Sequence, residues 1–188
     1  MSNPRNFSAL QLQTERLQLR PLVESDATAL LEIFSDPRVM RYWSTGTWQS
    51  ISEAEALIAR DQAGMASDEY LRLGLVRQQD SQLLGHCCLF NFNDQCRRAE
   101  IGYGMAYSAW GHGYMHEALT RVVEYAFTEL ALNRIEADID PRNERSAHSL
   151  ERLGFQREGF LRERWIVDGE VSDSALYGLL KAEWRVEG

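Results

Sequence analysis

The stretch Trp110-Gly111-His112-Gly113-Tyr114-Met115 decides how the rest of the chain is interpreted. The apolar and aromatic residues 101–106 precede it and have the composition of a buried strand. Apolar side chains then recur at helical spacing, which predicts a helix over residues 113–130. A glycine-rich turn between strand and helix exposes the first backbone N–H groups of the helix, at the positive end of its dipole. This suits a phosphate or pyrophosphate, although a tight turn without a ligand has the same pattern.

Two better-known phosphate-binding motifs are excluded at this position. A dinucleotide-binding fingerprint would need a third glycine near His116, and a P-loop would need Gly-Lys followed by Ser or Thr. Neither is present, so other parts of the chain have to identify the ligand.

Length and composition indicate one globular domain over residues 1–188. A chain of 188 residues can bury one core, and its 44% hydrophobic and 26% charged residues are ordinary globular values. No apolar run is long enough to span a bilayer, and residues 1–6 lack the apolar core of a signal peptide. We therefore expect a cytoplasmic protein with no membrane partner.

Charge and cysteine content exclude further classes of protein. The formal net charge of −8 argues against nucleic-acid binding, which usually needs a basic face, and favours a cationic substrate such as an amine. Cys87, Cys88 and Cys96 are odd in number and crowded, unlike a disulfide framework. No Cys/His pattern has the spacing of metal ligands, so we expect no metal.

The order of the remaining elements is typical of an α+β domain. The expected strands are residues 10–22, in which Leu17-Gln18-Leu19 alternate before Pro21, and residues 70–76, 83–92, 99–106, 134–139, 160–167 and 174–180. The three strands between residues 70 and 106 follow one another closely, which predicts an antiparallel meander. The last two form a hairpin whose turn is Asp168-Gly169.

The other expected helices are bounded by capping signals. Ser25 or Asp26 caps the first, and Asp36-Pro37 ends it. The segment Ser52-Glu53-Ala54-Glu55 reads as a capping box that opens a helix to about residue 65. Asn143 or Glu144 begins a short helix that reaches residue 153.

Several motifs, in matching order along essentially the whole chain, resemble one known family. The acetyl-CoA motif of the GNAT N-acetyltransferases resembles Ala99-Glu100-Ile101-Gly102-Tyr103, Trp110-Gly111-His112-Gly113-Tyr114 and Glu117-Ala118-Leu119. The RimJ/RimL branch of that family is similar at Thr14-Glu15-Arg16-Leu17, Arg134-Ile135-Glu136-Ala137, Asp140 to Ser146, Leu150 to Phe155, Arg157-Glu158-Gly159 and Tyr177-Gly178-Leu179-Leu180.

The resemblance implies a fold and an activity. The GNAT fold is a mixed, mostly antiparallel sheet flanked by helices, with strands that splay apart at the acetyl-CoA site. The activity is transfer of an acetyl group from acetyl-CoA to a primary amine, by direct attack in a ternary complex. In this branch the acceptor is typically the α-amine of a protein, first of all a ribosomal protein. Some relatives acetylate small amines instead, and an acetyl-CoA-binding module without turnover is a further alternative. We expect a monomer or a homodimer.

The resemblance also assigns the residues that contact acetyl-CoA. The backbone N–H groups of Gly111, His112, Gly113, Tyr114 and Met115 would hold the pyrophosphate. The pantetheine arm would pair with the preceding strand as an added strand does. The cofactor-binding residues of that strand are Ile101, Tyr103 and Met105.

The catalytic residues implied by the resemblance are Glu100 and Ser146. Glu100 would take a proton from the amine, and its alternative is a solvated or hydrogen-bonded strand glutamate. Ser146, with Asn143, would lie beside the pantetheine and the sulfur, and Ser146 would protonate or stabilise the departing thiolate. The alternatives are a helix cap for Asn143 and an ordinary first-turn residue for Ser146.

Four positions depart from the family pattern. Ser108 stands where the acetyl-CoA motif has Gln or Arg, and Leu150 stands where many members have a tyrosine. In relatives closer to RimL, a glutamate that is proposed as the base falls near the position of Trp165, so that role does not transfer to this chain. Gly104 replaces a frequent aromatic residue, which either removes packing or enlarges the acyl or acceptor tunnel.

Aromatic, cysteine and histidine residues complete the expectations. Tyr42, Trp43 and Trp48 either line the acceptor side or pack in the core. Cys87 and Cys88 lie in no nucleophile motif and are expected to pack. The histidines near the turn, His112 and His116, are expected to meet solvent or phosphate, and His148 is expected at the surface.

Overall fold

The structure, a computed structural model, describes residues 7–185 and is built around one eight-stranded sheet. The strands are β1 (Leu12–Gln13), β2 (Leu17–Arg20), β3 (Leu71–Arg77), β4 (Leu83–Asn93), β5 (Arg98–Met105), β6 (Arg134–Ile139), β7 (Gln156–Val167) and β8 (Glu170–Leu180). Their order is β1-β2-β3-β4-β5-β6-β8-β7, and only the pair β5–β6 is parallel. The predicted α+β class, the mostly antiparallel sheet and the meander are confirmed.

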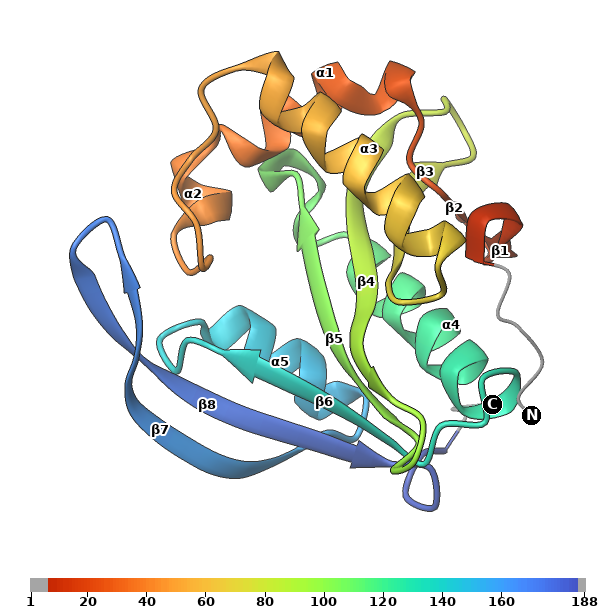
Figure 1. The fold of residues 1–188 in the computed structure, drawn as a ribbon, viewed down its shortest axis with the longest axis vertical. Helices are drawn as coiled ribbons and strands as arrows, with labels where there is room; N and C mark the ends of the chain where they lie inside the picture. Colours follow the sequence, from red (N-terminus) through yellow and green to blue (C-terminus); the bar gives the residue numbers. More distant parts are fainter. Residues whose placement is uncertain (1–6, 186–188) are drawn as a thin grey trace.

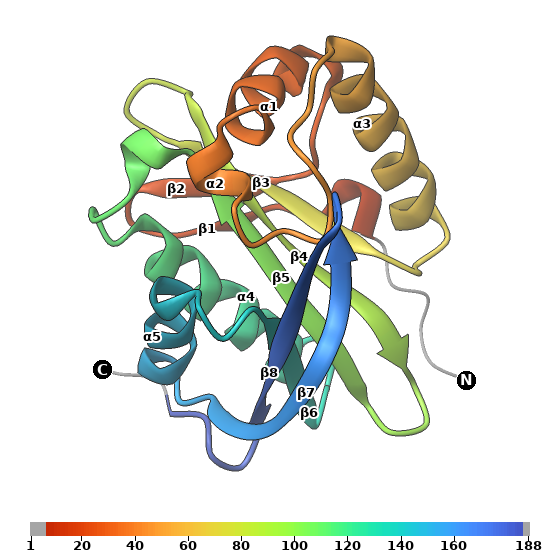
Figure 2. The same cartoon turned by 90° about the vertical axis from the view of Figure 1, so that its left-hand side faces the viewer.

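Helices cover both faces of the sheet (Figures 1 and 2). One face carries α1 (Ala27–Phe34), α2 (Pro37–Met40) and α3 (Ile51–Ala66), and the other carries α4 (Tyr114–Thr128) and α5 (Glu144–Arg152). Single 3₁₀ turns span Phe7–Ala9, Glu24–Asp26 and Tyr107–Ala109. No helix within residues 7–185 is long and apolar enough to cross a membrane.

The alternation of strand residues separates two hydrophobic clusters. Leu71, Leu73 and Leu75 of β3 join the larger cluster with α4, whereas Val76 joins the smaller one with α1, α2 and α3. Successive side chains of a strand point to opposite faces, so the same strand supplies both. The polar residue Arg72 therefore faces the side of α3.

The strands β5 and β6 share only a short stretch of pairing and then diverge (Figure 1). Arg98–Glu100 pair with Arg134–Glu136, and no further pair between these two fully described strands is formed. β6 continues instead along β8 as far as the pair Ile139–Ala175. The predicted splay at residues 101–105 is confirmed.

One predicted helix boundary was wrong, and two were confirmed with a different role for the capping residue. The capping box that opens α3 is Ser50 with Glu53, two residues earlier than predicted, and the Glu53 carboxylate accepts from the Ser50 N–H at 3.0 Å. Asp26 precedes α1, but its carboxylate binds Arg20 rather than a helix N–H. The Asp36-Pro37 pair ends α1 and also opens α2, because proline suits a first helical position and Asp36 accepts from the N–H of Arg38. The hairpin strands β7 and β8 are also longer than predicted.

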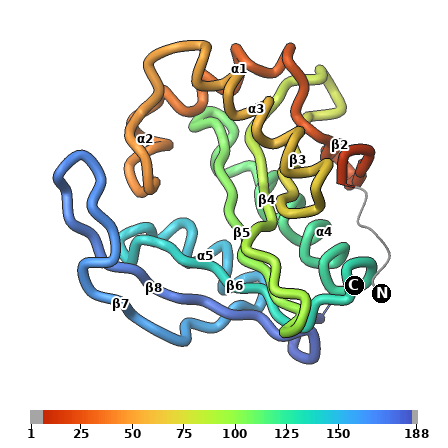
Figure 3. The backbone as a smooth tube through the Cα atoms, viewed as in Figure 1, coloured from red at the N-terminus to blue at the C-terminus, as the bar shows by residue number. Residues whose placement is uncertain are grey.

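Two distant segments meet at one side of the diverging strands (Figure 3). The segment that links α2 to α3 lies against the turn of the β7–β8 hairpin. A Cβ atom at Gly46 would lie 2.7 Å from Asp168 Oδ2, so the two segments are in close contact at this point.

Candidate active site

The glycine turn has the backbone conformation that its sequence suggests. Gly111 and Gly113 have φ angles of +80° and +82°, a region that residues with a Cβ rarely adopt. Gly113 is the N-cap of α4, and the first helical hydrogen bond runs from Glu117 N to Gly113 O at 3.1 Å. The N–H groups of Tyr114 and Met115 precede that bond, as at any helix N-terminus. No atom lies within 4 Å of a Cβ placed at Gly111, so the backbone is open to a ligand.

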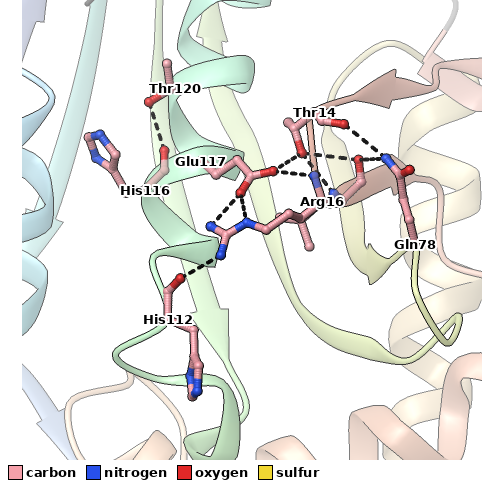
Figure 4. A network of polar contacts seen from close by, with 8 residues as sticks. Thr14, Arg16, Gln78, His112, His116, Glu117 and Thr120 are labelled. Atoms are coloured by element: carbon pink, nitrogen blue, oxygen red, sulfur yellow. Dashed lines mark hydrogen bonds and ion pairs between the residues drawn. The ribbon is translucent and has the colours of Figure 1, made fainter.

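A polar network holds this turn against the β1–β2 connection (Figure 4). The Arg16 side chain donates to Glu117 Oε2 at 2.7 Å through Nε and to the His112 carbonyl at 2.9 Å through Nη1. The other oxygen of Glu117 accepts from the Thr14 hydroxyl at 2.5 Å and from the Arg16 N–H at 2.8 Å. The family-like segments at Thr14–Leu17 and Glu117–Leu119 are thus the two halves of one clamp.

The clamp also sets the charge next to the turn. Burial raises the pKa of Glu117, but the hydrogen bonds from Thr14 and Arg16 outweigh it and hold the pKa below its ordinary value. A carboxylate in the first turn would repel a bound phosphate, and the Arg16 guanidinium neutralises it. Arg16 also lies 4.5 Å from the centre of the Tyr114 ring. The turn therefore presents backbone donors without an unpaired negative charge from Glu117.

A cavity of about 680 Å³ lies between the diverging strands. Its lining comes from the α2–α3 segment, from β3, β4 and β5, from the end of β6 with the start of α5, and from the β7–β8 hairpin. Among the residues predicted from the sequence it brings together Glu100, Ile101, Tyr103, Asn143 and Ser146. This volume is typical of small-molecule sites.

The remaining predicted cofactor residues lie outside the cavity lining. Gly111 to Met115 form the separate turn at α4, and Met105 is buried at the end of β5. The carbonyl of Met105 already accepts from Trp110 Nε1 at 2.9 Å. The indole therefore ties the end of β5 to the glycine turn.

Asn143 and Ser146 lie at the start of α5 and also line the cavity. Asn143 caps α5 by accepting from the Ser146 N–H at 3.2 Å, and both residues also line the cavity. The Ser146 hydroxyl lies 2.7 Å from the Tyr103 hydroxyl. The cap thus fixes the backbone of Ser146, while its side chain faces β5.

Two carboxylates from different strands line the cavity. Glu100 Oε1 accepts from Asn91 Nδ2 at 3.0 Å, so Glu100 is a hydrogen-bonded carboxylate that still faces the cavity. Asp138 lies two residues beyond Glu136, the partner of Glu100 on β6. Asp138 Oδ1 is buried without a hydrogen-bond partner among the described residues, and Arg164 Nε is 3.9 Å from Oδ2. Asp138 was not among the residues predicted from the sequence, although its position two residues after Glu136 on β6 was a usable signal.

A buried polar cluster in the cavity wall was also missed. Arg72 Nε lies 2.8 Å from Asp61 Oδ2 of α3, and its other nitrogens contact the Tyr70 hydroxyl and the ring nitrogens of His86. Burial, and then the Arg72 charge, hold the pKa of His86 well below its ordinary value, so the imidazole is neutral. Arginine and histidine inside otherwise apolar strands were the signal for this cluster.

The aromatic residues divide between cavity and core. Tyr42 and Trp43 line the cavity. Trp43 also packs edge-on against Phe34 of the smaller cluster, on which Trp48 stacks at 4.3 Å. A Cβ at Gly104 would lie 2.5 Å from Trp43 Cζ2. The space that an aromatic residue of β5 would take is therefore filled by Trp43, so Gly104 does not enlarge the tunnel.

The other departures have simple structural settings. Leu150 is completely buried, Ser108 is exposed, and Trp165 lines the cavity with its indole N–H donating to Ser174 Oγ at 3.1 Å. Cys87 is buried in the larger cluster, and burial raises the pKa of its thiol. The structure, over residues 7–185, contains no group of three acidic, histidine or cysteine side chains able to hold a metal ion.

Comparisons with known proteins match these features. The sequence profile of the acetyltransferase (GNAT) domain matches residues 16–156. The N-acetyltransferase p20 of Bacillus licheniformis is 34% identical over 173 residues, which cover 92% of this chain and 97% of that protein. The ribosomal protein uS5-alanine N-acetyltransferase of Escherichia coli is 28% identical over 189 residues, covering 95% of each chain. The spermidine N-acetyltransferase of Vibrio cholerae, solved with CoA and spermine, has a TM-score of 0.79 and 26% identity, covering 89% of this chain and 97% of that one.

The profile and the relatives extend over most of the chain, and the profile match includes the glycine turn and the diverging strands β5 and β6. The residue types and backbone geometry of the turn fit a pyrophosphate such as that of acetyl-CoA. The relatives are named as N-acetyltransferases. This chain therefore belongs to the GNAT family of acetyl-CoA-dependent N-acetyltransferases, as its resemblance to the RimJ/RimL branch predicted.

Proposed function

We propose that this enzyme acetylates the α-amine of a protein N-terminus, with Glu100 as the base and Ser146 as the group that stabilises the departing thiolate. The observation that carries the proposal is the cavity between β5 and β6, which Glu100 lines from one side and Ser146 from the other. The open glycine turn at α4 supports binding of the acetyl-CoA pyrophosphate by backbone donors. The backbone of Ile101 and Tyr103, beyond the last β5–β6 pair, supports binding of pantetheine.

The reaction needs a proton acceptor for the amine, which is Glu100, and a proton donor for the CoA sulfur, which is Ser146. Glu100 takes a proton from the acceptor ammonium, directly or through water, which leaves a lone pair on nitrogen. The carbon–nitrogen bond to the acetyl carbonyl forms as the carbon–sulfur bond breaks, and that electron pair goes to sulfur. The Ser146 hydroxyl donates to this sulfur, and the proton that nitrogen loses on becoming an amide balances the proton that the CoA thiol gains.

Acidic groups on the acceptor side favour a cationic amine. Glu100 and Asp138 both line the cavity, and the buried Oδ1 of Asp138 has no donor among the described residues. Buried carboxylate oxygens normally have a hydrogen-bond partner, and an ammonium N–H is a suitable one. This supports an amine acceptor of either size.

The two candidate acceptors, a protein N-terminus and a small amine, differ in size. Similarity to the uS5-alanine enzyme, over 95% of both chains, supports a protein N-terminus. The contact between Gly46 and Asp168 favours a small amine instead, because it joins two walls of the cavity across which an extended peptide would have to pass.

An acceptor panel tests both the activity and the size of the acceptor. We expect CoA release with a short peptide that has a free N-terminal alanine or serine. The same peptide with a blocked N-terminus should give none, and spermidine should react at least about tenfold more slowly. Faster reaction with spermidine would assign the small-amine alternative. No release with any amine would indicate a binding module without turnover.

The glycine turn gives a separate prediction about acetyl-CoA. Gly111→Val is expected to weaken acetyl-CoA binding by roughly 10- to 100-fold, the effect of losing one charge-assisted hydrogen bond of about 1.5–3 kcal/mol. The valine side chain would occupy space that is open at present and would also strain the left-handed backbone. Calorimetric titration of the folded variant measures the affinity.

Gly169→Val is the matched control for Gly111→Val. Gly169 has a φ of +84° and no atom within 4 Å of its Cβ position, so the backbone strain is comparable. It lies in the β7–β8 turn and should keep the acetyl-CoA affinity of the wild type. Equal affinities in both variants would mean that the turn at Gly111 is structural only.

A further inference from the structure

We propose that Tyr103 is a positioning residue for Ser146: its phenol donates to Ser146 Oγ and thereby directs the Ser146 proton at the CoA sulfur. This inference rests on the proposed role of Ser146 and adds a second hydroxyl to it. The two hydroxyls belong to β5 and α5 and are more than forty positions apart in the chain, so only the folded structure brings them together.

The geometry of the pair carries the inference. The Tyr103 and Ser146 hydroxyl oxygens are 2.7 Å apart, and the Tyr103 hydroxyl is 3.3 Å from the Ser146 carbonyl oxygen. Both residues line the cavity on the side of the diverging strands. Asn143 Oδ1 accepts from the Ser146 N–H, and Tyr103 contacts the Ser146 hydroxyl, so both the backbone and the side chain of the serine are held.

The chemistry of the two hydroxyls sets the direction of the bond. A phenol is a stronger acid than an alkyl alcohol, so Tyr103 is the better donor of the pair. Burial raises the pKa of Tyr103 to about 12, although the bond to Ser146 lowers it, so the phenol keeps its proton at neutral pH. With its lone pair engaged by Tyr103, Ser146 Oγ has its own proton left for the sulfur.

The proposed step leaves Tyr103 unchanged in charge. As the carbon–sulfur bond breaks, sulfur takes the bonding electron pair and accepts the Ser146 hydrogen bond. If the proton passes to sulfur, Ser146 Oγ is restored by the proton of Tyr103, and solvent then returns a proton to the phenol. In both cases the acceptor ammonium loses two protons in all: one passes through Glu100 to solvent, and the other balances the proton that the CoA thiol gains.

The test is a double-mutant cycle with Tyr103→Phe and Ser146→Ala. Tyr103→Phe removes one oxygen and keeps the ring, so the acetyl-CoA affinity and the melting temperature should stay near those of the wild type. We expect kcat to fall about tenfold in Tyr103→Phe and by a similar or larger factor in Ser146→Ala. The double variant should be no slower than Ser146→Ala, because a positioning residue has nothing left to position.

A matched control and a pH profile separate positioning from structure. Tyr177→Phe removes a phenol hydroxyl on β8 that faces Glu151 at 3.5 Å and lies outside the cavity lining, and it should keep the wild-type kcat. The kcat defect of Tyr103→Phe should be larger at high pH, where solvent supplies fewer protons to the sulfur, and should match the profile of Ser146→Ala.

Each outcome has a distinct meaning. Full activity of Tyr103→Phe beside a slow Ser146→Ala would overturn the role of Tyr103 and leave that of Ser146. Multiplying defects in the double variant would also overturn it, since the two residues would then act separately. Full activity of Ser146→Ala would refute the proposed role of Ser146 itself.

Discussion

Glu100→Gln is expected to lower kcat for amine acetylation by about 10²–10⁴, the usual range for loss of a general base, and to leave acetyl-CoA affinity unchanged. The amide keeps the shape of the side chain and its place beside Asn91 Nδ2, but it cannot accept a proton. The defect should shrink as the pH rises, because the acceptor amine then loses its proton without help. Steady-state CoA release across a pH series measures both effects.

Glu136→Gln is the matched control for this prediction. Glu136 is the register partner of Glu100 on β6, but Arg98 and Arg134 hold its carboxylate, and it does not line the cavity. Its kcat should stay close to that of the wild type. Normal turnover of Glu100→Gln at neutral pH would remove Glu100 from the mechanism and leave Asp138 or water as the proton acceptor.

Arg72→Met is expected to lower the free energy of unfolding by about 3–5 kcal/mol, because it leaves the Asp61 carboxylate buried without its partner. Both side chains of this ion pair are less than a tenth exposed. For a chain of this size the melting temperature should fall by roughly 6–20 °C. Replacing both partners, as in Asp61→Leu with Arg72→Met, should recover most of the loss, since neither charge then remains buried.

The pH dependence of Arg72→Met follows from the same carboxylate. Burial raises the pKa of Asp61 even with Arg72 present, and without Arg72 the rise should be larger. A folded-state pKa above the unfolded value makes stability fall as the pH rises between the two values. The deficit relative to the wild type should therefore be greatest at neutral pH and shrink toward about pH 4.

Arg121→Met makes the same substitution in an exposed pair. Arg121 and Glu124 are 31% and 42% exposed, and such pairs contribute at most about 1 kcal/mol. Thermal unfolding of both variants at pH 7 and near pH 4 completes the comparison. A pH-independent loss in Arg72→Met would mean that lost packing, rather than the unpaired carboxylate, causes it.

The sequence by itself determined the elements whose signals are local. The helix after Gly113, the meander between residues 70 and 106, and the left-handed turn at Gly111 and Gly113 follow from periodicity and from the conformational freedom of glycine. Local signals also competed: two S-x-x-E patterns overlap at the start of α3, and the helix begins with Ser50 and Glu53.

Tertiary structure alone decided which polar residues meet. Asp61 with Arg72, Tyr103 with Ser146, and Arg16 with Glu117 each join elements far apart in the chain. A strand pattern shows which face a side chain takes but not what lies opposite, so none of these pairs follows from spacing. Gly104 shows the same limit, because its missing side chain is replaced by Trp43 from a segment sixty positions away, and only the packed structure reveals that filling.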